Sequence, residues 1–164
     1  TRWETPKTWR TSFVPVSFLS AHQNIRSIVA RAENRCPLSS AVSNASKGAL
    51  ELLPLYMAEK VENILPQVKK SGWKIFCLDV TPGRYQSYLS LEKVKVDPSK
   101  AIFVLGSEGA GVSEEMAKVA DAGVSVRPGK GCLEEFPETL VDSLNVSVTA
   151  SILLAHLASL AKNN

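Results

Sequence analysis

Two stretches in the second half of the chain decide the fold class: AIFVLGSEGAGVS, residues 101–113, and SLNVSVTASILLAHL, residues 143–157. The first begins with five consecutive apolar residues, which predict a buried strand, and continues into a loop of three glycines around one carboxylate, Glu108. The second places Asn145 just before a long apolar-periodic segment, which predicts a helix with a polar cap. Small polar groups gathered at strand ends are typical of a ligand site.

The remaining chain alternates between strand and helix patterns. Apolar runs predict strands at residues 13–19, 73–80, 101–105 and 122–126. Helical spacing predicts helices at residues 24–33, 58–71, 113–120 and from about 146 onward. The second of these helices is expected to be kinked at Pro66 and to turn Ile64 and Leu65 inward. This alternation predicts an α/β fold with a mostly parallel sheet flanked by helices.

Bulk composition is that of an ordinary globular domain. The chain has 164 residues, of which 45% are hydrophobic and 21% charged, and its net charge is +3. Any contact with nucleic acid is therefore expected to come from a local patch of charge. Cys36, Cys77 and Cys132 form no CxxC pair, which argues against a disulfide framework and a zinc site and favours reduced thiols. No apolar run reaches eighteen residues, so no membrane span is expected.

The glycine-rich loop does not match the common phosphate-binding motifs. It lacks the lysine of a P-loop and does not fit GxGxxG, and Glu108 would repel phosphate. This carboxylate suits a ligand that carries an amine or a sulfonium, or it braces the backbone of the turn. Asn145 caps the following helix, or it faces a ligand if Ser143 and Ser147 supply the cap. The sequence shows neither a Ser/His/Asp arrangement nor an acidic pair at useful spacing, so hydrolase chemistry is not favoured.

Four segments resemble the motifs of a known enzyme family. LGSEGAGVS (residues 105–113) and SLNVSV (residues 143–148) resemble motifs 2 and 3 of the SPOUT methyltransferases, in the TrmH-like branch that methylates ribose 2′-hydroxyls of RNA. QNIRSIVARAE (residues 23–33) resembles motif 1. The serine-rich stretch at residues 36–56 is most similar to the mitochondrial large-subunit rRNA guanosine 2′-O-methyltransferases. The resemblance covers residues 20–164, which are expected to form the catalytic domain.

The resemblance implies a fold, a cofactor and a set of site residues. In that family the C-terminal segment threads a deep trefoil knot, S-adenosylmethionine binds among the knot loops, and a homodimer completes the active site on RNA. No metal takes part. The implied cofactor-binding residues are Leu105, Gly106, Val126, Pro128, Leu144, Val146 and Ser147. The implied catalytic residues are Arg31, Asn145, Asn24 and Glu108.

Motif 1 departs from the family pattern. Arg26 stands where the family has glycine, Ala30 stands at the arginine position, and Arg31 follows one residue late. Arg31 is the preferred catalytic arginine and Arg26 the competing choice. The resemblance implies that this arginine helps to deprotonate or orient the ribose hydroxyl. Because arginine is a poor base, its alternative role is electrostatic: it binds the adjacent phosphate and stabilises the developing negative charge.

Three further questions stay open at this stage. Residues 1–19 form an arm packed on the domain, or a linker from an RNA-binding module that uses Trp3 and Trp9 for stacking. The substrate is large-subunit rRNA or, in the alternative, tRNA, and an inactive RNA-binding or ribosome-assembly protein with the same fold is the third reading. The subgroup resemblance implies the mitochondrial matrix, and the cytoplasm is the other compartment considered.

Overall fold

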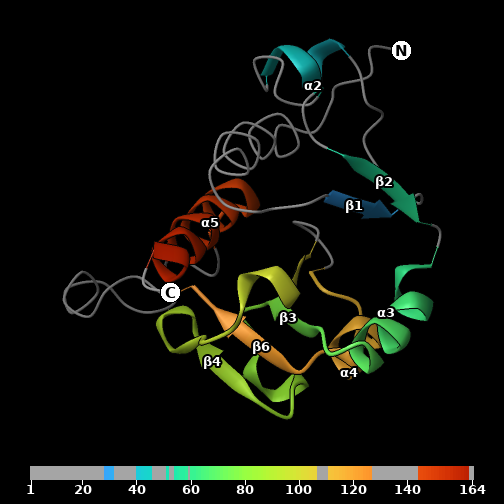
Figure 1. Cartoon of the computed structure of the whole chain (residues 1–164), viewed down its shortest axis with the longest axis vertical. Coiled ribbons are helices and arrows are strands. Elements are labelled where there is room, and N and C mark those ends of the chain that lie inside the picture. The colour runs from blue at the N-terminus through green and yellow to red at the C-terminus, as the bar shows by residue number, and fades with distance from the viewer. Residues whose placement is uncertain are drawn as a thin grey trace.

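The computed structural model presents an α/β architecture (Figure 1). It describes residues 28–31, 40–45, 51, 54–58, 60–106, 111–126 and 144–162. The strand predicted at residues 13–19 lies outside this described part. Within it, no helix is both long and apolar enough to pass through a bilayer.

The main sheet has four strands in the order β4-β6-β3-β5, and every pairing is parallel. Its strands are β3 (Lys74–Leu78), β4 (Tyr88–Ser90), β5 (Ala101–Leu105) and β6 (Ala122–Ser125). The predicted strands at residues 73–80, 101–105 and 122–126 are therefore confirmed. β4 was not predicted, because three residues between polar neighbours carry too short a pattern.

Side chains of β3 alternate between two hydrophobic clusters, one on each face of the sheet. Phe76 and Leu78 belong to a cluster with Leu153 and Leu157 of α5 (Val146–Lys162). Ile75 and Cys77 belong to the second cluster, with residues of α3 (Val61–Lys70) and α4 (Glu114–Val119). Figure 1 shows α5 on one side of the sheet and α3 and α4 on the other. This arrangement confirms the predicted parallel sheet flanked by helices.

The first helix of this face, α3, differs in detail from the prediction. It begins at Val61 and not at residue 58, because Ala58 ends strand β2 (Leu55–Ala58). Leu65 is buried as expected, but Ile64 is 51% exposed, so its predicted inward position is wrong. Pro66 lies inside the helix, and the kink predicted there stays a prediction.

Residues 28–31, predicted as part of a helix, form strand β1 (Ile28–Arg31) instead. β1 pairs in parallel with β2, with Ile28 opposite Leu55 and Arg31 opposite Ala58. Consecutive β-branched residues, Ile28 and Val29, favour an extended chain, and pairing with β2 outweighs the helical spacing. A further short helix, α2 (Ser40–Ala45), lies between the two strands in the sequence.

The predicted trefoil knot depends on the paths of residues 107–110 and 127–143, which lie outside the described residues. The knot therefore stays a prediction. The same is true of the division into an arm of residues 1–19 and a catalytic domain of residues 20–164.

Candidate functional site

The carboxyl ends of the central strands form the candidate site. In the parallel register Leu78 of β3 lies opposite both Leu105 of β5 and Val124 of β6. The residues that follow these strands, including Gly106 and Val126, are therefore at one edge of the sheet. Ligands of open parallel sheets bind at this edge, outside the carboxyl ends of the strands.

Two of the predicted cofactor residues have an environment that suits a ligand held by backbone groups. Leu105 is 38% exposed, although it ends an otherwise half-buried strand. At Gly106 a Cβ atom would lie 2.3 Å from the carbonyl carbon of Gly111 and 2.6 Å from the nitrogen of Val112. Only a residue without a side chain allows this close approach of two backbone segments. The two ends of the glycine-rich loop are thus in contact, and we call Gly106 with residues 111–112 the loop neck.

The exit of the loop neck is fixed by α4 and by the core. Gly111 has a φ of +63°, a left-handed conformation that favours glycine. Val112 is only 3% exposed and packs in the cluster with Leu65 and Met116. The side chain of Ser113 accepts a hydrogen bond from the Met116 N–H at 3.4 Å and caps α4.

Asp79, directly after β3, is the centre of a polar cluster at the same edge. Its side chain is 7% exposed, and Oδ2 accepts hydrogen bonds from Arg84 Nη1 at 3.0 Å and from the Tyr85 hydroxyl at 2.7 Å. Oδ1 accepts from the Thr81 N–H at 3.0 Å. The backbone carbonyl of Asp79 accepts from the Tyr88 hydroxyl at 2.8 Å. Each oxygen of Asp79 is therefore engaged.

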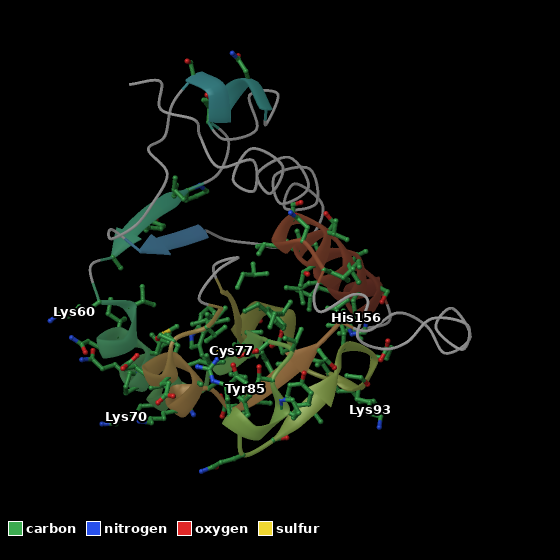
Figure 2. All side chains as sticks on the ribbon, turned by 180° about the vertical axis from the view of Figure 1, so that it is seen from behind. Lys60, Lys70, Cys77, Tyr85, Lys93 and His156 are labelled. Atoms are coloured by element: carbon green, nitrogen blue, oxygen red, sulfur yellow. The ribbon has the colours of Figure 1, made fainter. Side chains whose placement is uncertain are left out.

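The ionisation of this cluster follows from its contacts. Burial acts to raise the pKa of Asp79, but hydrogen bonds from Tyr85 and Thr81 and the charge of Arg84 outweigh it, so the pKa lies below its ordinary value of 3.8. The pKa of Tyr85 is raised, first by burial and then by its hydrogen bond to Asp79. Burial also raises the pKa of the neighbouring Cys77 thiol to about 11. Figure 2 shows Cys77 and Tyr85 close together in the middle of the molecule.

The start of α5 carries the other group of predicted residues. The Asn145 Oδ1 atom accepts a hydrogen bond from the Ser147 N–H at 2.9 Å and another from the Ser147 hydroxyl. Asn145 therefore caps the helix itself, and the idea that Ser147 supplies the cap is wrong: Ser147 is the donor. Asn145 is exposed, Leu144 and Val146 are half-buried, and Ser147 is buried.

The predicted catalytic residues are not all within the described part. Arg31 is the last residue of β1, in the two-stranded sheet and not in the main one. Asn24, Arg26, Glu108 and Pro128 lie outside the described residues, so their predicted roles stay predictions. No group of three or more potential metal ligands occurs among the residues that the structure describes.

Sequence reasoning missed the cluster around Asp79. Its available signal was an acidic residue at the end of an apolar strand, followed within six positions by Arg84 and Tyr85. What the sequence did not show is that Arg84 also reaches the loop neck: its Nη2 donates to the Val112 carbonyl at 2.7 Å.

A parallel sheet with helices on both faces and a glycine-rich loop at its carboxyl edge defines a ligand-binding α/β domain. Comparison with known proteins then gives the family. Residues 19–155 match the model of the SpoU rRNA Methylase family. This match covers most of the chain, which therefore belongs to that family.

Individual relatives agree with this assignment. The chain is 28% identical over 137 residues to the rRNA methyltransferase 1, mitochondrial, of Dictyostelium discoideum, covering 83% of this chain and 24% of that protein. It is 29% identical over 151 residues to the protein of the same name from Homo sapiens, covering 87% of this chain and 41% of that protein. The chain thus spans less than half the length of these relatives.

A solved structure supports the fold. The AdoMet-bound rRNA methyltransferase from Sinorhizobium meliloti superposes with a TM-score of 0.70 at 16% identity, covering 92% of this chain and 52% of that one. At this identity the likeness shows the fold alone. It confirms the fold class predicted from the motifs.

Proposed function

We propose that the chain is the catalytic part of an RNA methyltransferase that moves a methyl group from S-adenosylmethionine to a ribose 2′-hydroxyl of large-subunit rRNA, at a guanosine. The observation that carries the proposal is the parallel register that brings Leu105, Gly106 and Val126 to one edge of the sheet. Membership of the SpoU rRNA Methylase family and relatives named as mitochondrial rRNA methyltransferases support it.

The described residues fit the proposed cofactor. The exposed side chain of Leu105 offers apolar contact, and the loop neck brings backbone groups of two segments close together. The cofactor would be held by seven residues, of which Pro128 lies outside the described part: Leu105, Gly106, Val126, Pro128, Leu144, Val146 and Ser147. Bound there, the sulfonium would supply an electrophilic methyl group: the ribose oxygen would bond to the methyl carbon as the carbon–sulfur bond breaks, which leaves the thioether S-adenosylhomocysteine, and the hydroxyl proton would pass to solvent.

In this proposal the chain supplies orientation and charge. Arg31 holds the RNA phosphate or stabilises negative charge on the ribose oxygen, and Asn145 fixes the helix start beside the reacting groups. Holding both reactants in line accounts for much of the acceleration. Arg26 is the competing arginine, and Asn24 and Glu108 complete the proposed set.

The proposed assembly is a homodimer in mitochondria. Val148 and Ile152, one turn apart on α5, are 45% and 39% exposed, and an apolar pair on a helix surface supports a contact between two copies. The names of the relatives support mitochondrial localisation, and the matrix is the compartment proposed. Light scattering coupled to size exclusion tests the dimer: Ile152→Lys is expected to yield monomer, and a monomeric wild type would refute it.

The function is tested in two stages. Isothermal calorimetry should show that the chain binds S-adenosylmethionine, and no binding at millimolar concentration would refute the enzyme proposal. Transfer of a labelled methyl group is then measured on rRNA and tRNA transcripts, with digestion to nucleosides. The expected product is 2′-O-methylguanosine from rRNA.

Substrate controls separate the alternatives. A transcript with 2′-deoxyguanosine at the modified position should accept no label, because the reacting hydroxyl is missing. Labelling of tRNA alone would favour the tRNA alternative. Cofactor and RNA binding without any transfer, by this chain and by a longer chain containing it, would favour an inactive RNA-binding or assembly protein.

A further inference from the structure

Arg84 joins two parts of the candidate site that are far apart in the sequence. Its Nη1 donates to Asp79 Oδ2 at 3.0 Å, and its Nη2 donates to the Val112 carbonyl at 2.7 Å. The guanidinium therefore connects the end of β3 to the exit of the glycine-rich loop. Because the guanidinium group is planar and rigid, binding both acceptors fixes the distance between Asp79 and Val112 and their relative orientation.

The guanidinium is itself held in place. Asp79, its anionic partner, is bound by the Tyr85 hydroxyl at 2.7 Å and the Thr81 N–H at 3.0 Å. The Asp79 N–H donates to the Val124 carbonyl at 3.1 Å, so the backbone of Asp79 is anchored to the neighbouring strand β6. Arg84 is 27% exposed and Asp79 only 7%, which places the ion pair largely out of water, where charge-assisted hydrogen bonds are strong.

The far end of the bridge is the loop neck. Gly106 and Gly111 approach so closely that a Cβ at Gly106 would lie 2.3 Å from the Gly111 carbonyl carbon. Val112 presents its backbone nitrogen to Gly106 and its carbonyl to Arg84. A displacement of Val112 therefore changes the distance between the two ends of the loop.

We propose that Arg84, oriented by Asp79, is a positioning residue that sets the loop neck and thereby the backbone groups that bind the cofactor. This inference rests on the proposed function, because it assigns Gly106 and its neighbours to the cofactor. Arg84 does not touch the reacting atoms. Its effect is on cofactor affinity through the position of the loop.

The test uses Arg84→Lys, which keeps the positive charge but replaces the two guanidinium nitrogens, Nη1 bound to Asp79 and Nη2 bound to Val112, by a single ammonium nitrogen that cannot occupy both positions. Amide hydrogen exchange of the peptide containing the loop neck should become at least about tenfold faster, and the Kd for S-adenosylmethionine should rise about tenfold, since hydrogen bonds to charged groups have this magnitude. The KM for RNA should stay unchanged.

The chain offers a matched control in Lys69→Met. Lys69 also bridges a carboxylate and a carbonyl: its Nζ lies 3.4 Å from Asp121 Oδ1 and donates to the Val119 carbonyl at 2.8 Å. This bridge is at the C-terminal end of α4, and neither Asp121 nor Val119 belongs to the loop neck. Lys69→Met is expected to lower the melting temperature as Arg84→Lys does, with exchange at the neck and cofactor affinity unchanged.

The outcomes separate this inference from the proposed function. Hydrogen exchange reports on the neck without cofactor, so unchanged exchange in Arg84→Lys would overturn the positioning role whether or not the wild type binds S-adenosylmethionine. Faster exchange with unchanged Kd would overturn the link to the cofactor. Equal rises of Kd in Arg84→Lys and Lys69→Met would indicate general destabilisation and also overturn it. A wild type that binds no cofactor would refute the proposed function, and with it the link to the cofactor.

Discussion

Replacing Gly106 by alanine should disturb the loop neck while leaving the rest of the sheet intact. The added Cβ would meet the Gly111 carbonyl carbon at 2.3 Å, the Gly111 oxygen at 2.6 Å and the Val112 nitrogen at 2.6 Å. Optimal carbon–carbon contacts lie at about 3.5 Å or more, so the two segments must separate by about 1 Å. All three contacts are with backbone, so no side chain can rotate away.

The size of the effect follows from this displacement. Forcing an extra methyl group into a packed site costs about 1–3 kcal/mol. For a chain of this length each kcal/mol lowers the melting temperature by about 2–4 °C. A shift of about 1 Å in groups that position a substrate costs about a hundredfold in rate. Gly106→Ala should therefore lose more methyl transfer than its loss of stability explains.

Gly83→Ala is the matched control for this substitution. A Cβ at Gly83 meets no atom within 4 Å, and its φ is not in the left-handed region. Both variants are compared by thermal unfolding, by calorimetry with S-adenosylmethionine and by methyl transfer at a temperature where both are folded. If Gly106→Ala matched Gly83→Ala in stability and cofactor affinity, the close approach at the loop neck would be refuted.

Three other substitutions or treatments have defined outcomes. The folded pKa of Asp79 lies below its ordinary value of 3.8, so its contribution to stability is present above about pH 5 and is lost as pH falls through the lowered pKa. Asp79→Asn should therefore be less stable at pH 7 and should show a shallower loss of stability below about pH 5 in urea unfolding, whereas slopes equal to wild type would contradict the role of the ion pair. Burial raises the pKa of Cys77 to about 11, so iodoacetamide at neutral pH should label Cys77 only after unfolding, as peptide mass spectrometry can show; rapid labelling of the folded chain would contradict this. Asn145→Ala should lose about 1 kcal/mol of unfolding free energy with the cap, and Asn145→Ser should keep it. If both variants lose methyl transfer, the amide acts on the ligand; if Asn145→Ser is fully active, capping is the whole role.

The sequence predicted those strands of the main sheet that carry a complete local signal. β5 is a continuous apolar run, and β3 and β6 are mostly apolar, with Lys74 at the start of β3 and Ser125 at the end of β6. Such runs can be recognised without knowledge of their partner strands. The prediction for β1 was wrong because four residues fit the helical and the strand periodicity equally well. Pairing with β2, which begins at Leu55, determines that these residues form a strand. β4 depends in the same way on β6, since Ser90 pairs with Ser125.

The same distinction between local signals and tertiary contacts applies to the candidate site. Leu105 ends β5, and Gly106 and Val126 directly follow β5 and β6, so their common edge could be predicted from the parallel order of the strands. The bridge from Arg84 to the Val112 carbonyl joins positions 28 residues apart and depends on where the Pro82–Arg84 turn meets the loop exit. No local pattern encodes that meeting, because it results from the register of β3 against β5.

Gly106 and Arg84 act on the same backbone segment, so their effects should not be independent. Val112 contributes its nitrogen to the contact with Gly106 and its carbonyl to the bond with Arg84. Once alanine at position 106 has displaced Val112, Arg84 has already lost its hydrogen bond to the Val112 carbonyl. Arg84→Lys then causes a smaller further loss of cofactor binding. The two losses of cofactor binding free energy should therefore sum to at least about 0.5 kcal/mol more than the loss in the double variant.

Lys69 provides the reference for this cycle. Its partners, Asp121 and the Val119 carbonyl, are shared with neither Gly106 nor Arg84. The unfolding free energies lost in Gly106→Ala and Lys69→Met should therefore add to within about 0.5 kcal/mol. If the pair of Gly106 and Arg84 were equally additive, both in unfolding and in cofactor binding, Val112 would not couple them. The loop neck would then be set by the glycines alone.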